Sequence, residues 1–254
     1  MDIWYEVTGD GPALVLVHAN PFDHDLFLYQ TAHFSTWFRV IGVDIRGYGR
    51  SAKVTTPFTL KDMCDDVIAV MDELEIASAV LMGCSVGSGT ALLLGLDHPK
   101  RFSAIILVGG NSGSSDRYMK RVDGYRADLG GYHIKHMKEL IAPAFAESRL
   151  GRHLLNMFVE REPRLSGDAI ARVFMAGNST DTTERLPQMT VPTLVVNGEF
   201  DHSLKAGQRT ASLVPGAAHK VLPGTGHACC IEDPAGFDAL VLDFLRARNL
   251  LPDL

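Results

Sequence analysis

The sequence predicts an α/β protein in which a mostly parallel, twisted β-sheet carries helices on both faces. Short runs rich in Val, Ile and Leu recur along the chain, and longer stretches with helical spacing separate them. Strands that alternate with helices in this way indicate βαβ units and therefore parallel strands. A length of 254 residues suits one large domain of this class.

Six short segments are the expected strands. Near-continuous apolar runs lie at residues 13–18, 39–44, 79–83, 103–108 and 193–197. A run without polar alternation is typical of a strand that is buried on both faces of a sheet. Residues 218–222 are expected to form the last strand.

Three stretches carry the clearest helical patterns. In residues 60–74 the apolar side chains fall on one helical stripe, formed by Met63, Val67, Val70, Met71 and Leu74. Residues 86–96 are small and apolar almost throughout, so we expect a buried helix there. Residues 233–248 again place apolar side chains at helical spacing and should form the last helix.

The stretch between residues 112 and 190 breaks the alternation. It contains no convincing strand, its pattern is mostly helical, and Gly and Pro residues interrupt it. The sequence therefore predicts a core in two parts, residues 1–112 and 187–254, and a helical cap or lid, residues 113–186. Because parallel sheets bind ligands at the carboxyl ends of their strands, an insertion that leaves such an end is well placed to cover a site.

Composition and charge argue against several classes of partner. The net charge is −6 and the Lys and Arg residues are scattered, so neither nucleic acid nor an anionic membrane is an expected partner. The N-terminal residues lack the pattern of a signal peptide, and no apolar run approaches the length of a membrane span, so we expect a cytoplasmic protein. Four cysteines match no zinc pattern and are expected to be reduced thiols: Cys64, Cys84, Cys229 and Cys230.

The sharpest local signal is the segment Gly83-Cys84-Ser85-Val86-Gly87, which joins an expected strand to the buried helix. In this setting the G-x-S-x-G pattern predicts a serine nucleophile on a sharp turn. Residues two positions before and after the serine pack closely there, and glycine avoids the clash of a Cβ atom. Ser85 is therefore the candidate nucleophile.

A serine hydroxyl needs a base within hydrogen-bond reach, and histidine is best suited to this role near neutral pH. Of the ten histidines, His227 lies in a Gly-rich loop after the last expected strand. Asp201 follows the preceding strand and is the candidate acid that orients the base, with Glu199 as its rival.

A reaction at a carbonyl also needs donors for the oxyanion. The backbone N–H of Val86, directly after the nucleophile, is one candidate. The other is expected in the loop after the first strand, where Pro21 has no N–H, so Asn20 is the better candidate. Neither a metal nor an organic cofactor is implied.

At this point the sequence resembles the α/β-hydrolase superfamily, in particular its small capped bacterial esterases and lactonases. The resemblance implies hydrolysis of a carboxylic ester or lactone through an acyl-enzyme, with a small molecule as substrate. The chain departs from the family pattern at Ala19, where Gly is usual, and at Cys84, where a larger residue is usual. The resemblance rests on five segments in family order: residues 18–22, 44–51, 83–87, 197–201 and 224–227.

Three other functions stay open at this stage: C–C bond hydrolysis of a diketone-type substrate, perhydrolysis or acyl transfer to a nucleophile other than water, and a ligand receptor with a weakly active triad. Whether the chain forms a homodimer is also open. Four aromatic residues are expected to line the substrate pocket: Phe22, Tyr132, Phe145 and Phe158. Further candidates in the cap are Tyr118, Tyr125, His133, His136, Met137, Met157, Phe174 and Met175.

Overall fold

The computed structural model describes residues 1–110, 112–113 and 117–252. Its centre is a seven-stranded sheet in the order β1-β3-β2-β4-β5-β6-β7. β1 is antiparallel to β3, and the other neighbouring strands are parallel. The strands are β1 (Tyr5–Thr8), β2 (Ala13–Val17), β3 (Arg39–Val43), β4 (Ala79–Cys84), β5 (Phe102–Val108), β6 (Thr193–Gly198) and β7 (Ala218–Leu222).

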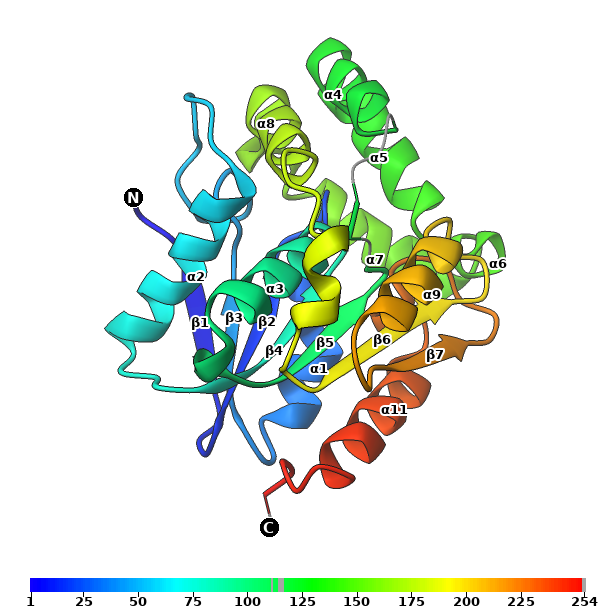
Figure 1. Cartoon of the computed structure of the whole chain (residues 1–254). Coiled ribbons are helices and arrows are strands. Elements are labelled where there is room, and N and C mark those ends of the chain that lie inside the picture. Colours follow the sequence, from blue (N-terminus) through cyan, green and yellow to red (C-terminus); the bar gives the residue numbers. More distant parts are fainter. Residues whose placement is uncertain (111, 114–116, 253–254) are drawn as a thin grey trace.

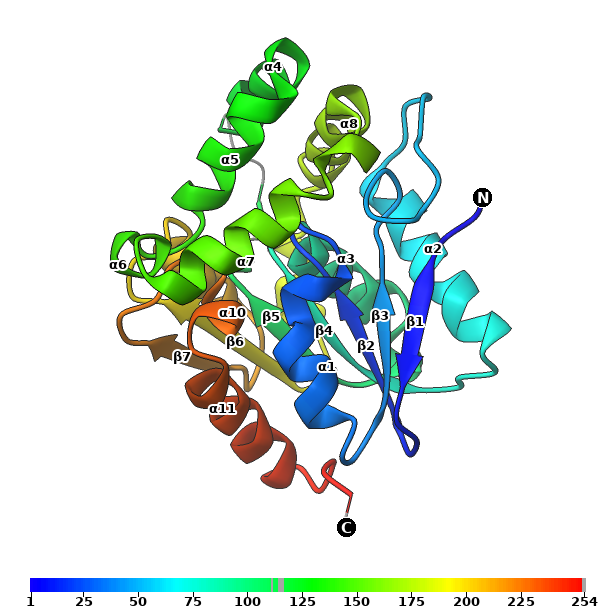
Figure 2. The same cartoon turned by 180° about the vertical axis from the view of Figure 1, so that it is seen from behind.

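Helices cover both faces of this sheet (Figures 1 and 2). α2 (Leu60–Glu73), α3 (Val86–Asp97) and α9 (Leu204–Leu213) lie on the face that Figure 1 turns to the viewer. η1 (His24–Phe27), α1 (Leu28–Phe34), α10 (Cys229–Glu232) and α11 (Pro234–Arg246) belong to the other face. Successive strand residues alternate between two buried clusters: Val15 belongs to one, and Leu14 and Leu16 belong to the other.

Between β5 and β6 the described chain is helical. α4 (Arg117–Ala127), α5 (Leu129–Glu139) and α8 (Gly167–Gly177) stand above the sheet in both views, and α4 packs against α8. The shorter or lower elements of this region are α6 (Pro143–Ala146), α7 (Arg149–Val159), η3 (Glu162–Arg164) and η4 (Thr183–Gln188). The three-part division at residues 113 and 187 stays a prediction, and residues 114–116 near its first boundary lie outside the described residues.

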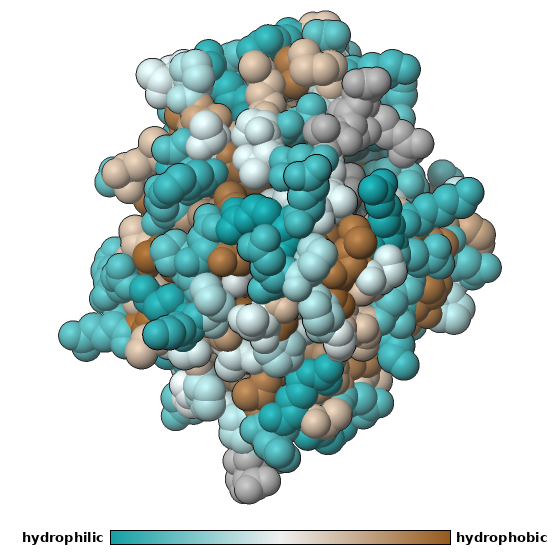
Figure 3. All heavy atoms as spheres, in the orientation of Figure 1, coloured by the Kyte–Doolittle hydropathy of each residue, from teal (hydrophilic) through white to brown (hydrophobic). Residues whose placement is uncertain are grey.

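The predicted fold class is confirmed, and each of the six expected strands is present within one residue at either end. β1 was not predicted, because its four residues include no fully buried one and no apolar run marks it. The helices α1, α9 and α10, of seven, ten and four residues, were not predicted either. Hydrophilic residues prevail on the face that Figure 3 shows, with hydrophobic ones scattered among them. Among the described residues no helix combines the length and the hydrophobicity that crossing a membrane requires.

Candidate active site

Ser85 sits on a tight turn between β4 and α3. Its backbone has φ 55° and ψ −110°, a conformation that non-glycine residues rarely adopt. Its N–H donates to the carbonyl of Val108 at 2.8 Å, which fixes the turn against β5. A Cβ atom on Gly83 would overlap the carbonyl of Gly87, and one on Gly87 would overlap that of Val17. Close backbone contacts therefore require both glycines and hold Ser85 at the end of the strand.

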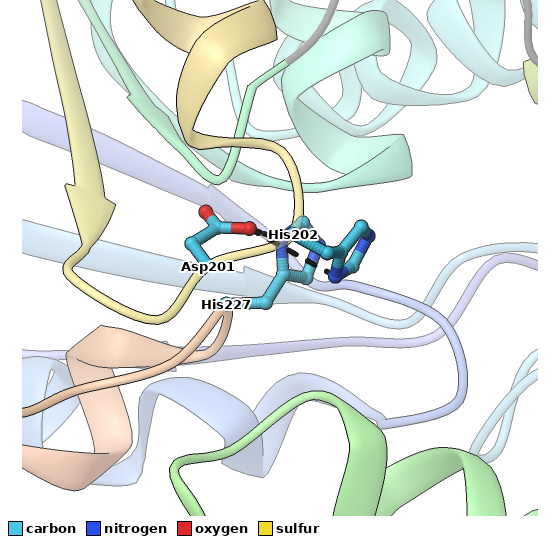
Figure 4. A group of neighbouring side chains, drawn as sticks. All are labelled: Asp201, His202 and His227. Carbon is cyan, nitrogen blue, oxygen red and sulfur yellow. Dashed lines mark hydrogen bonds and ion pairs between the residues drawn. The ribbon is translucent and has the colours of Figure 1, made fainter.

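His227 lies in the loop between β7 and α10 and is buried. Its Nδ1 is 2.7 Å from Oδ1 of Asp201, in the loop after β6 (Figure 4). Nε2 of His227 is also buried, and it has no hydrogen-bond partner among the described residues. Since Nδ1 faces a carboxylate, it carries the ring proton, and Nε2 is left as a lone-pair acceptor.

Several donors hold the Asp201 carboxylate. Nδ2 of Asn197 donates to Oδ2 at 2.7 Å, and the N–H and hydroxyl of Ser203 donate to Oδ1 at 2.7 and 2.8 Å. Burial alone would raise the pKa of Asp201, but the charge and hydrogen bond of His227, with the donors from Ser203 and Asn197, hold it well below its usual range. The carboxylate therefore stays ionised beside His227.

The rival acid has a different place. Glu199 is exposed, and its Oε2 accepts a hydrogen bond from the N–H of Gly224 at 2.9 Å. The structure brings Asp201 to His227 and leaves Glu199 at the outside of the loop, where it ties the β6 and β7 ends together.

Ser85 and His227 line one cavity of about 190 Å³, together with Asn20. The helical region between β5 and β6, which we call the cap, contributes five residues to its wall: Tyr118, Arg121, His136, Leu140 and Phe174. Gly109, His202, Ser203 and Ala206 complete the lining. A larger cavity of about 390 Å³ lies between the cap and the loop after β2, but Ser85 and His227 do not line it, so the smaller one is the candidate active site.

The four aromatic residues expected in the pocket are not among the residues that line this cavity, and their role in substrate binding stays a prediction. Phe22 and Phe158 pack edge to face at 4.8 Å and line the larger cavity, and with Phe145 they also line a separate small void. Tyr132 packs against Tyr125 within the cap. Helical spacing could not tell Tyr132 and Phe158 from the cavity residues Tyr118 and Phe174, because all four are aromatic positions of helices.

Of the two candidate oxyanion residues, Asn20 lines the cavity and Val86 directly follows the cavity residue Ser85. Asn20 is buried, and its Oδ1 accepts a hydrogen bond from the hydroxyl of Tyr48 at 2.5 Å, which orients the side-chain amide. Val86 is the first residue of α3, where N–H groups have no partner within the helix and where the helix dipole favours negative charge. Their role as oxyanion donors stays a prediction.

Arg121, His202 and Ser203 line the cavity and were not singled out from the sequence. Ser203 could have been found as a hydroxyl two residues after Asp201, a spacing that favours a local side-chain turn. The sequence does not distinguish Arg121 as a site residue, because a charged side chain on a helix is usually exposed to solvent. Asp201, His202 and His227 each place one ligand atom within 4.8 Å of the others (Figure 4), a spacing that could hold a metal ion. Nδ1 of His227 and Oδ1 of Asp201 are already joined by their hydrogen bond.

The chain is similar to known proteins along nearly its whole length. Residues 12–234 match the family described as alpha/beta hydrolase fold. The AB hydrolase superfamily protein YisY of Bacillus subtilis (strain 168) is 27% identical, with 95% of this chain and 94% of the relative covered. A 2-hydroxy-6-oxononadienedioate/2-hydroxy-6-oxononatrienedioate hydrolase of Cupriavidus pinatubonensis (strain JMP 134 / LMG 1197) is 27% identical, with 82% and 76% covered. The crystal structure of the enol-lactonase from Burkholderia xenovorans LB400 is 25% identical, with a TM-score of 0.88 and 96% of each chain covered.

Proposed function

The chain belongs to the α/β hydrolase family, and from this premise we propose that it is a serine hydrolase that cleaves a carboxylic ester or lactone through an acyl-enzyme. One observation carries the proposal. His227 turns Nδ1 to an ionised, hydrogen-bonded Asp201 and shares a cavity with Ser85, and its buried Nε2 has no hydrogen-bond partner in the described part of the chain. A base that is oriented on one side and open on the other suits the activation of a serine hydroxyl.

The reaction then follows from these groups. The hydroxyl oxygen of Ser85 attacks the carbonyl carbon of the substrate while its proton passes to Nε2 of His227. Asp201 stabilises the imidazolium through Nδ1. The N–H groups of Val86 and Asn20 would donate to the oxyanion. His227 gives the proton to the leaving alkoxide, the acyl-enzyme remains, and a water activated by the same histidine releases the acid.

A second candidate function is hydrolysis of a C–C bond in a diketone-type substrate. The observation that favours it is the likeness to the 2-hydroxy-6-oxononadienedioate/2-hydroxy-6-oxononatrienedioate hydrolase of Cupriavidus pinatubonensis, at 27% identity. Turnover of a vinylogous diketone by protein that leaves aryl esters and lactones intact would favour this function.

A fluorophosphonate probe and a turnover assay together test the proposal. The probe should label Ser85, as located by peptide mass spectrometry, and the protein should hydrolyse aryl esters or lactones with many turnovers. Labelling without sustained turnover would instead favour a ligand receptor with a weakly active triad. The proposal fails if the probe does not label Ser85 and the protein hydrolyses none of the aryl esters and lactones.

A further inference from the structure

The Ser85 cavity differs in charge from the rest of the molecule. The whole chain has 30 acidic residues against 24 Lys and Arg. Yet the described residues that line the cavity include no Asp or Glu, and Arg121 is the one Lys or Arg among them. The chain as a whole is acidic. The cavity of its candidate nucleophile is nevertheless lined by a guanidinium and, among the described residues, by no carboxylate.

The histidine beside Arg121 does not share this charge. His136 is buried, and its Nδ1 lies 2.8 Å from the hydroxyl of Tyr125. Burial, together with the positive charge of Arg121, pushes the pKa of His136 well below its usual range, so this ring is neutral near pH 7. Arg121 is thus the permanent cation on the cap side of the cavity.

The guanidinium keeps donors for a ligand. Nη1 of Arg121, on α4, donates to Oε2 of Glu139, on α5, at 2.6 Å. Among the described residues Glu139 is its hydrogen-bond partner, while a guanidinium carries five N–H donors. The Arg121 side chain is 17% exposed and the Glu139 side chain 42% exposed. Glu139 therefore engages one N–H group of the guanidinium, and Arg121 itself lines the cavity.

We propose that Arg121 binds a carboxylate of the substrate, so that the preferred substrates are small esters or lactones that also carry a free carboxylate. This inference rests on the proposed function. A carboxylate matches the planar donor fork of arginine, and the charge-assisted hydrogen bonds are stronger than neutral ones. Ser85, His227 and Arg121 line the same cavity, and the proposal places the reacting carbonyl at Ser85 and the carboxylate at Arg121. A cavity of about 190 Å³ limits the length between them.

The test compares two substrates that differ by one negative charge and one methyl group. One is the mono-4-nitrophenyl ester of glutaric acid, and the other is its methyl-capped, uncharged diester. In wild-type protein the ratio of kcat/KM for the charged ester to that for the neutral ester should be about 10 to 100, the range expected for loss of one charge-assisted contact. The difference should lie mainly in KM, because Arg121 does not touch the reacting bond.

Three variants separate recognition from cap structure. Arg121→Gln should bring the ratio close to one. Glu139→Gln breaks the same ion pair but keeps the guanidinium, so its ratio should be equal to or above that of wild type. Arg126→Gln is the matched control, since Arg126 is an exposed residue of the same helix that also pairs with a carboxylate, that of Asp168. Its ratio should equal that of wild type.

Two results would overturn the inference: a wild-type ratio near or below one, which needs no variant to fold, or equal loss of the ratio in Arg121→Gln and Glu139→Gln. In either case Ser85 can still label and turn over the neutral ester, and the proposed function survives. If neither ester is hydrolysed and Ser85 does not react with a fluorophosphonate, the proposed function itself has failed.

Discussion

The two walls of the Ser85 cavity are built by different forces. The core wall includes residues at the ends of β2, β4, β5, β6 and β7. Close backbone contacts hold it, together with buried hydrogen bonds such as those to Asp201. The cap wall consists of side chains from α4, α5 and α8, held by ring contacts and by ion pairs that reach solvent, such as Arg121–Glu139. We therefore expect substitutions in the first wall to impair the chemistry and substitutions in the second wall to change the preferred substrate.

The largest effect is expected at the nucleophile. Ser85→Ala removes the attacking oxygen and only one atom of volume, so esterase turnover should fall by several orders of magnitude while the folded protein remains. Steady-state rates and a thermal melt would measure both. Ser212→Ala, at a partly solvated hydroxyl of α9, is the control and should keep full activity. More than about a tenth of wild-type turnover in Ser85→Ala would rule out the proposed mechanism.

Asp201 and Glu199 provide a sharper comparison within the same loop. Asp201→Asn presents the wrong hydrogen-bond partner to Nδ1 of His227 and should lower kcat on the order of 10³- to 10⁴-fold. Glu199→Gln alters an exposed side chain that contacts the N–H of Gly224, so kcat should change less than about threefold. Comparable losses in the two variants would mean that the acid is misassigned.

Gly87 and Gly89 test the claim that close contacts build the core wall. Both lie in α3, but a Cβ on Gly87 would collide with the carbonyls of Val17 and His18, while one on Gly89 would lie 3.8 Å from Leu60, an ordinary contact. Gly87→Ala should lower the free energy of unfolding by about 2–4 kcal/mol. Gly89→Ala should leave it equal or raise it by about 0.5–1 kcal/mol, because alanine favours a helix interior. Urea unfolding would decide, and a harmless Gly87→Ala would contradict the close-contact argument.

Glu232 accepts one hydrogen bond from the core and one from the cap, and its ionisation should make the free energy of unfolding depend on pH. Its Oε1 accepts from the N–H of Gly226, beside His227, and its Oε2 from the N–H of Ala142, in the cap, both at 2.8 Å. Burial raises the pKa of Glu232 to about 7, against the two amides, which lower it. Because the folded-state pKa lies above the unfolded value, wild type loses stability as pH rises from about 4.5 to 7, where the unfolded carboxyl ionises first.

Glu232→Gln removes this ionisation. The free energy of unfolding of Glu232→Gln minus that of wild type should therefore grow as pH rises from 5 to 7 and then level off above the folded pKa. Urea titrations at several pH values would measure this difference. A difference that stays constant over this range would show that Glu232 does not titrate between those limits.

The contrast between the walls also explains what the sequence could predict. Three candidate catalytic residues follow the ends of strands: Ser85, Asp201 and His227. The apolar runs of these strands and the glycines beside these residues can be recognised in the sequence. β1 leaves none, because its four residues form an edge strand with no fully buried side chain. In the cap, helical spacing predicts helices but not which of them face the cavity, so Phe158 was expected there and Phe174 could only be one of many candidates. The position of Arg121 at the cavity depends on how α4 packs against α5, and the local sequence does not show this packing.

The smallest effect on catalysis is expected in the cap wall. There the ranking of kcat/KM across substrates is more informative than the size of the change for any one of them. Phe174 lines the cavity and is buried against Tyr118 and Tyr125, whereas Phe158 is a buried residue of α7 that does not line this cavity. Phe174→Ala should change the ranking of kcat/KM across esters of increasing acyl length, by roughly tenfold for the most affected ester, because it removes apolar contact from one part of the cavity.

Phe158→Ala is the matched control, since it deletes the same ring at a similar depth. It should lower the melting temperature and scale all esters by one factor, because no substrate touches it. If both variants scale all esters alike, the cap wall only supports the fold, and selectivity must come from the core wall. If Phe158→Ala reorders the esters as strongly as Phe174→Ala does, the cavity extends further under α7 than the static structure shows, and the separation of the two voids is lost when substrate binds.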